Sequence, residues 1–63
     1  MRKDWKESQD RFNKIDGDNF GACLSETQTM TKYLEWRIRK SDNKMCIIQY
    51  YENGKGYQIY AAE

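Results

Sequence analysis

The polar and apolar positions along the chain repeat with two different periods. Residues 2–15 carry apolar or small side chains every three or four positions, between charged and amide-bearing ones. These recurring positions are Trp5, Ser8, Phe12 and Ile15. Because this spacing places them on one narrow stripe of a helix, the pattern predicts an amphipathic helix over residues 2–15. Gly17, directly after Asp16, is a typical residue for the end of such a helix.

The second half of the chain alternates with period two, which is typical of strands with one buried face. The predicted strands cover residues 33–40, 44–52 and 55–62. Between the last two lies Asn53-Gly54, a strong signal for a type I′ hairpin turn that pairs Glu52 with Lys55. In the resulting register, each of three pairs shares one face of the sheet: Tyr50 with Tyr57, Ile48 with Ile59, and Cys46 with Ala61.

The loop between the first two of these strands sets which face of residues 33–40 is buried. The apolar side chains of this strand are Leu34, Trp36 and Ile38. A two-residue loop turns them toward the face of Gln49, whereas a three-residue loop, with Asn43 in the left-handed conformation, turns them toward the face of Cys46. We expect the three-residue loop because it collects the apolar side chains on one face, which the helix stripe then covers.

Residues 19–32 admit two interpretations. Every second residue from Phe20 to Leu24 is apolar, and several threonines follow, which favours a fourth strand at the edge of the sheet. Alternatively, Ser25 and Gln28 resemble a capping box that begins a second helix. In both cases the sequence predicts a single small α+β domain, with an N-terminal amphipathic helix packed on one face of a three- or four-stranded antiparallel meander.

The composition limits the size of the core. The chain has 63 residues and a mass of 7.6 kDa, and 38% of its residues are hydrophobic and 14% aromatic. A chain of this size buries only about 60% of its unfolded surface, so its folding free energy is close to zero without further help. We therefore expect a mainly aromatic core, stabilised further by a staple or by association with a partner.

The N-terminus and the cysteines bear on the cellular compartment in which we expect the protein. The chain begins without the apolar core of a signal segment, and it holds no apolar run long enough to cross a membrane. We expect a cytoplasmic protein without membrane contact. In that compartment Cys23 and Cys46 are expected as reduced, partly buried thiols.

Patterns for catalysis and metal binding are weak throughout the chain. There is no histidine, the commonest acid–base residue and metal ligand. Residues 16–21 begin like a calcium loop, but Phe20 cannot coordinate and Thr27 stands where the loop requires glutamate. Two distant cysteines do not make a zinc site, and no base is present to activate either thiol. We expect a non-enzyme with no catalytic residues, no metal site and no cofactor.

The sheet face opposite the helix is the candidate functional surface. A face exposed to water should be polar, but in the favoured register this one mixes tyrosines and aliphatic residues with arginines. The predicted partner-binding residues are Tyr33, Arg37, Arg39, Met45, Ile47, Tyr51 and Tyr60. Exposed patches of these residue types usually mark an interface. The opposing interpretation is that residues 19–32 fold over this face, or that scattered tyrosines face water.

Three classes of function follow from this surface. We favour a small non-catalytic protein-binding module, an inhibitor or regulator of the kind that phages and mobile elements encode, which contacts a protein target or a second copy in a homodimer. The alternative is a nucleic-acid-binding module whose tyrosines stack on bases while Arg and Lys contact phosphates. The near balance of eleven basic and ten acidic residues counts against nucleic acid. A small enzyme is the least favoured class.

Overall fold

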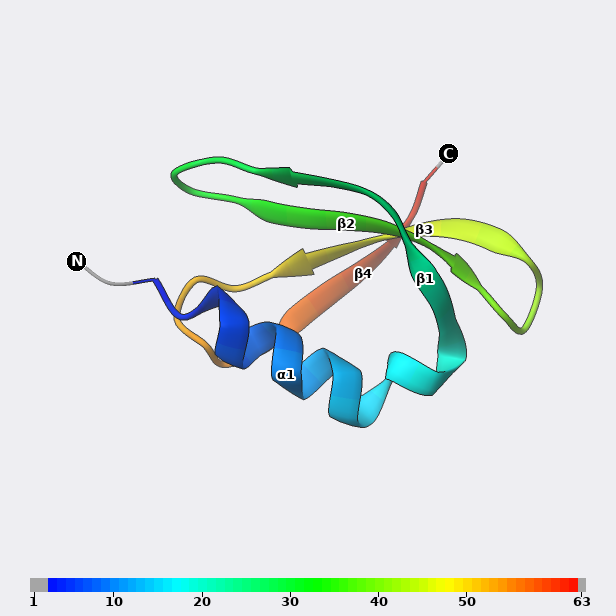
Figure 1. Cartoon of the computed structure of the whole chain (residues 1–63), viewed down its shortest axis with the longest axis horizontal. Coiled ribbons are helices and arrows are strands. Elements are labelled where there is room, and N and C mark those ends of the chain that lie inside the picture. The colour runs from blue at the N-terminus through cyan, green and yellow to red at the C-terminus, as the bar shows by residue number, and fades with distance from the viewer. Residues whose placement is uncertain (1–2, 63) are drawn as a thin grey trace.

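One helix precedes a four-stranded antiparallel sheet and packs across one of its faces (Figure 1). The computed structural model describes residues 3–62. The elements are α1 (Trp5–Ile15), the short 3-10 turn η1 (Gly17–Asn19), β1 (Phe20–Gln28), β2 (Tyr33–Arg39), β3 (Lys44–Tyr50) and β4 (Tyr57–Ala61). The strands lie side by side in the order of the sequence. The predicted α+β meander with an N-terminal helix is therefore confirmed.

Helix α1 begins at Trp5, later than the predicted residue 2, and Arg2 lies outside the described residues. The backbone amide of Asp4 donates to Glu52 O at 2.8 Å, which ties the chain ahead of the helix to a loop of the sheet. Trp5, Ser8 and Phe12 are buried as predicted. Ile15 is 66% exposed, so its assignment to the buried stripe is wrong.

Phe20 occupies the inner layer that the sequence assigned to Ile15. After η1 the chain turns back under the sheet, and the Phe20 ring packs on the Phe12 ring with centroids 5.6 Å apart. Residues 20–28 form an edge strand, which confirms one of the two interpretations of residues 19–32; a second helix from Ser25 is wrong. Register shifts within β1 break the expected alternation, and Leu24 is 60% exposed.

The hairpin of β3 and β4 has the predicted register but a different turn. Tyr50 lies opposite Tyr57, Ile48 opposite Ile59, and Cys46 opposite Ala61. The strands stop at Tyr50 and Tyr57, short of the predicted ends 52 and 55. Among residues 3–62 the non-glycine residue with positive φ is Asn43, so the turn is not type I′ at Asn53. The wider loop 51–56 instead packs against the helix.

The register of β2 against β3 differs from the prediction by one residue. Arg39 pairs with Lys44, so the loop comprises residues 40–43 rather than three residues. Asn43 has a φ of 63°, as expected for its left-handed conformation. The Arg39 guanidinium donates to both Asp42 carboxylate oxygens, at 2.9 and 2.6 Å, and closes this longer loop. Because side chains alternate, one residue of shift turns every side chain of β2 to the other face.

Aromatic rings make up most of the core between α1 and the sheet. The buried hydrophobic residues are Trp5, Phe12, Phe20, Cys46, Ile48 and Tyr50. Phe12 lies at the centre, with the Tyr57 ring 5.2 Å away and the Tyr50 ring 6.0 Å away. Cys46 is buried and Cys23 is exposed, and both are free thiols. Within residues 3–62, no helix has the length and apolar character needed to cross a membrane.

Candidate functional site

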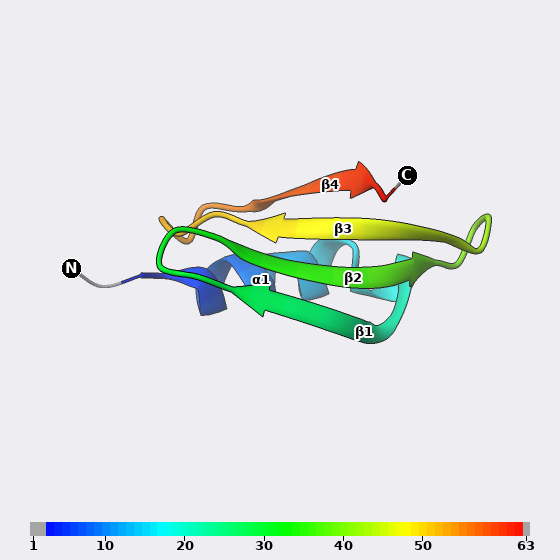
Figure 2. The same cartoon turned by 90° about the horizontal axis from the view of Figure 1, so that it is seen from above.

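The uncovered face of the sheet collects side chains from all four strands. We call it the outer face and define it by the residues that the strand register turns away from α1. These residues are Ser25, Thr27, Leu34, Trp36, Ile38, Met45, Ile47, Gln49, Gln58 and Tyr60. Figure 2 looks onto this face and shows α1 on the far side of the sheet, so no described element covers it.

The outer face is largely apolar, and the side chains toward its margins are the most accessible. Met45 is 42% exposed and Tyr60 is 40% exposed. The side chains of β2 on this face, together with Ile47, are partly exposed and shield one another. Hydrophobic side chains at the centre of a sheet face form a continuous patch, unlike single exposed residues scattered over a surface, and such patches mark contact sites.

The charges of the sheet lie on the wrong face for a lone domain. None of the outer-face residues is charged at neutral pH, although 33% of the chain is Asp, Glu, Lys or Arg. The face toward the helix instead carries Glu26, Glu35 and Arg37. A sheet with one side in water normally shows the opposite distribution, apolar inside and polar outside. This distribution leaves an uncharged and largely apolar face in contact with water, which is unfavourable for a lone domain.

Hydrogen bonds link the polar residues at one corner of the outer face. The Tyr60 hydroxyl lies 2.7 Å from Gln49 Oε1 and 3.1 Å from Gln58 Oε1. The hydroxyl of Tyr51, just beyond the end of β3, donates to Gln58 Oε1 at 3.4 Å. The polar groups of this corner therefore satisfy each other, which lowers the cost of removing water from them.

The structure brings together only part of the predicted site. Met45, Ile47 and Tyr60 lie on the outer face, and Tyr51 adjoins it through Gln58. Tyr33, Arg37 and Arg39 do not lie there, because the shifted register of β2 turns them toward the helix side. In their place stand three apolar residues that the sequence assigned to the core: Leu34, Trp36 and Ile38. The alternative of a two-residue loop has the wrong loop length but turns these three side chains toward the face of Gln49, where the structure has them.

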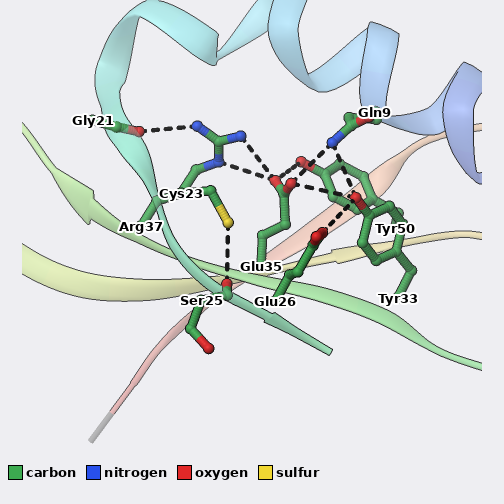
Figure 3. Close-up of polar contacts among 9 residues, drawn as sticks. All are labelled: Gln9, Gly21, Cys23, Ser25, Glu26, Tyr33, Glu35, Arg37 and Tyr50. Carbon is green, nitrogen blue, oxygen red and sulfur yellow. Dashed lines mark hydrogen bonds and ion pairs between the residues drawn. The ribbon is translucent and has the colours of Figure 1, made fainter. Parts of the chain in front are cut away.

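A polar cluster around Glu35 occupies the helix side of β2 (Figure 3). Glu35 is only 3% exposed. Its Oε1 accepts from the Tyr50 hydroxyl at 2.5 Å and from Arg37 Nε at 3.0 Å, while its Oε2 accepts from Gln9 Nε2 at 2.9 Å. Arg37 also donates to Gly21 O at 2.9 Å, and its guanidinium carbon lies 5.4 Å from the centre of the Phe12 ring. Arg37 is thus fully engaged within the domain.

This cluster shifts the pKa of the surrounding phenols. Burial, and then the hydrogen bond to Glu26, raise the pKa of Tyr33 to about 12. Burial and the hydrogen bond to Glu35 hold the pKa of Tyr50 well above its ordinary value. For Arg37, burial lowers the pKa, but the hydrogen bond and the charge of Glu35 raise it by more. All three groups therefore keep the protonation state that the cluster requires at neutral pH.

A shallow groove of about 460 Å³ borders the cluster between α1 and β1. Its lining includes Gln9, Glu26, Tyr33 and the exposed Cys23. Burial first, and the Glu35 carboxylate second, raise the pKa of the Cys23 thiol above its ordinary value. A nucleophilic cysteine requires the opposite shift, toward the thiolate. Within the described residues, no group of three or more Cys, Asp or Glu side chains is arranged to hold a metal ion.

No family model, no curated protein and no solved structure matches this chain. The site must therefore be interpreted from its own residues.

Proposed function

We propose that the protein is a non-catalytic protein-binding module whose outer face is the contact surface. The observation that carries this proposal is the charge-free apolar face on the side of the sheet that α1 leaves open. Three of its residue types, Trp, Tyr and Met, are enriched at the centres of interfaces. Such a module acts by occupying a surface of its partner, as an inhibitor or a regulator does.

The positions of the arginines favour a protein partner over nucleic acid. Nucleic-acid binders depend on Lys and Arg that release counterions from phosphates. Arg37 is paired with Glu35, with Nη2 3.0 Å from Oε1, and Arg39 is paired with Asp42. The outer face itself offers the rings of Trp36 and Tyr60 but no cation. A stacking platform without a basic rim is poorly suited to a phosphate backbone.

The environment of the ionisable groups supports a non-catalytic role. The Glu35 carboxylate accepts hydrogen bonds at both oxygens and is only 3% exposed, so it is poorly placed to exchange a proton with a substrate. Burial and the nearby Glu35 carboxylate raise the pKa of the Cys23 thiol, which disfavours the nucleophilic thiolate. General acid–base and nucleophilic catalysis both require groups poised for transfer.

Photo-crosslinking from the outer face tests the proposal. A benzophenone amino acid replaces Met45 on the outer face, or Met30, which is 87% exposed and lies away from it, as the matched control. After irradiation in cells that naturally produce the protein, we expect a covalent adduct with a polypeptide from position 45 and none from position 30. A nuclease-sensitive adduct, or equal adducts from both positions, would overturn the proposal.

A further inference from the structure

We propose that the partner of the outer face is a second copy of this chain, in a two-fold symmetric dimer. This inference rests on the proposed function and specifies its partner. The two sheets stack face to face, and the symmetry axis runs parallel to the strands between β2 and β3. Each β2 then lies over β3 of the other copy, and each β1 lies over β4.

The chemistry of the face fits a copy of itself better than an unlike partner. Contacts between different proteins usually gain specificity from complementary charges, and charged rims steer their encounter. The outer face has no charge to complement, and two copies placed face to face meet no repulsion. Permanent and homodimeric interfaces are the class in which apolar surface predominates.

In one row of four side chains across the sheet, large and small residues are ordered so that they complement the same row in the second copy. Ser25 pairs with Trp36, Trp36 with Ile47, and Ile47 with Tyr60, so the four lie in register across all strands. An axis parallel to the strands reverses this row in the second copy. The small Ser25 then lies over the large Tyr60, and the indole of Trp36 lies over the narrower Ile47. Packing of large side chains against small ones gives the interdigitation that stacked sheets require.

The size of the face requires that the dimer use all four strands. Seven residues along β2 or β3 span roughly 24 Å, and four strands span roughly 19 Å. Counted over all four strands, the flat area is therefore roughly 450 Å² per copy before side-chain relief adds to it, which is below the roughly 600 Å² per partner of the smallest standard interfaces, so the dimer belongs to the weak class of contacts. The edge residues Ser25 and Tyr60 thus belong to the contact along with the central ones.

Because the hydrophobic core on the helix side is small, dimerisation also stabilises the folded chain. The buried hydrophobic cluster on the helix side holds six residues. Small domains with so little core commonly depend on disulfides, metals or oligomerisation, and the cysteines here are unpaired. A second copy of the chain is present in every preparation of the pure protein, unlike any other partner.

Sedimentation equilibrium of the pure protein tests the inference. We expect the mass to rise from 7.6 kDa toward twice that value between micromolar and millimolar concentration. Ile47→Asp places an unpaired carboxylate over the apolar centre and should raise the dissociation constant roughly 100-fold or more. The matched control is Ile15→Asp: Ile15 is also an exposed isoleucine, at 66%, but lies at the end of α1 on the other side of the sheet. It should leave the dissociation constant unchanged.

Two results would overturn the inference. One is a wild-type protein that stays at 7.6 kDa up to millimolar concentration, and the other is an equal effect of both aspartate variants. If circular dichroism shows that Ile47→Asp is unfolded, Met45→Lys replaces it, because Met45 is 42% exposed and tolerates charge in the monomer. A monomer that still yields the Met45 photo-adduct with another protein would reject the dimer and retain the proposed function. A monomer that yields no Met45 photo-adduct would reject both the dimer and the proposed function.

Cross-linking distinguishes this symmetry from other face-to-face arrangements. In a Cys23→Ser background, one preparation carries Ser25→Cys and the other carries Tyr60→Cys, and the two are mixed with a short bismaleimide. The axis parallel to the strands predicts mainly the mixed 25–60 product. A dominant 25–25 product would contradict the axis, since it requires β1 of one copy to lie over β1 of the other.

Discussion

Glu35 is a buried charged residue at the centre of a hydrogen-bonded cluster on the helix side of β2. Its carboxylate is buried and lies opposite Ile48 in the ladder, where an apolar residue would be ordinary. The Tyr50, Arg37 and Gln9 side chains all donate to it. A shift of one residue would take Glu35 out of this cluster and place it on the outer face. The cluster therefore fixes the register that keeps Leu34, Trp36 and Ile38 on the outer face.

Removing the Glu35 carboxylate should destabilise the fold strongly. Glu35→Ala leaves the Arg37 guanidinium and the Tyr50 hydroxyl without their acceptor, and the loss of one partner of a buried pair costs roughly 3 kcal/mol. Glu26→Ala is the matched control, because Glu26 accepts from Tyr33 but is exposed. It should cost less than about 1 kcal/mol. Urea unfolding measures both, and equal effects would contradict the role given to Glu35.

The raised pKa values of the tyrosines predict a loss of stability in alkali. Tyr33 and Tyr57 have pKa values of about 12 in the folded protein, because of burial and their carboxylate partners, Glu26 and Asp16. An unfolded tyrosine titrates near 10. The folded state therefore holds more protons between these values, and its stability is complete below about pH 10 and falls as the pH rises toward 12.

Urea unfolding at a series of alkaline pH values measures this loss. Tyr57→Phe keeps the ring packed on Phe12 but removes one titrating group, so its stability should depend less steeply on pH than that of the wild type. Identical pH profiles for the two proteins would show that Tyr57 does not contribute.

At the scale of the elements, the loop 51–56 joins the sheet to the helix. The Ser8 hydroxyl donates to Tyr51 O at 2.6 Å, and Arg11 Nε donates to Gly54 O at 2.9 Å. Gly54 is buried against α1 with a φ of +79°. A Cβ there would lie 2.9 Å from the Cβ of Asp4. This close approach and the positive φ explain why the residue at position 54 is glycine.

Gly54→Ala should therefore be costly. The left-handed backbone costs a residue with a Cβ roughly 1–2 kcal/mol, and the contact with Asp4 adds to it, so we expect a loss of about 2 kcal/mol or more. Gly21→Ala is the control, because a Cβ there would meet Ile38 O at an ordinary 3.7 Å. Thermal unfolding compares the two, and a Gly54→Ala protein as stable as Gly21→Ala would contradict the docked loop.

The sequence predicts some elements of this fold better than others, for physical reasons. The register of β3 on β4 follows from strong alternation on both strands and a central Asn-Gly, and it survives a change of turn type. The register of β2 on β3 changes when the loop is longer by one residue. The assumption that apolar side chains gather on the covered face selects the wrong register. That assumption fails because the outer face is itself apolar. Met45, Ile47 and Tyr60 lie on the outer face as expected, because β3 and β4 pair in the predicted register.

At the scale of the whole molecule, both faces of the sheet carry apolar side chains. In the part of the chain that the structure describes, only one of these faces is covered. Helix α1 covers the inner layer around Phe12, and the outer layer around Trp36 and Ile47 remains open (Figures 1 and 2). The charges that would solubilise the outer layer lie between the helix and the sheet. In the dimer, the second copy of the chain buries the outer layer, so both apolar layers are covered. The position of the charged residues is then explained without a further helix or strand.

An isotope-filtered NOE experiment on an equal mixture of labelled and unlabelled protein tests this contact most directly. It detects only protons of different copies that lie close together. We expect cross-peaks from the labelled Ile47 methyl groups to the unlabelled Trp36 indole, and from Ser25 to the Tyr60 ring, at concentrations where the dimer forms. Intermolecular cross-peaks confined to α1, or none from the outer face at millimolar concentration, would contradict a sheet that is buried on both sides.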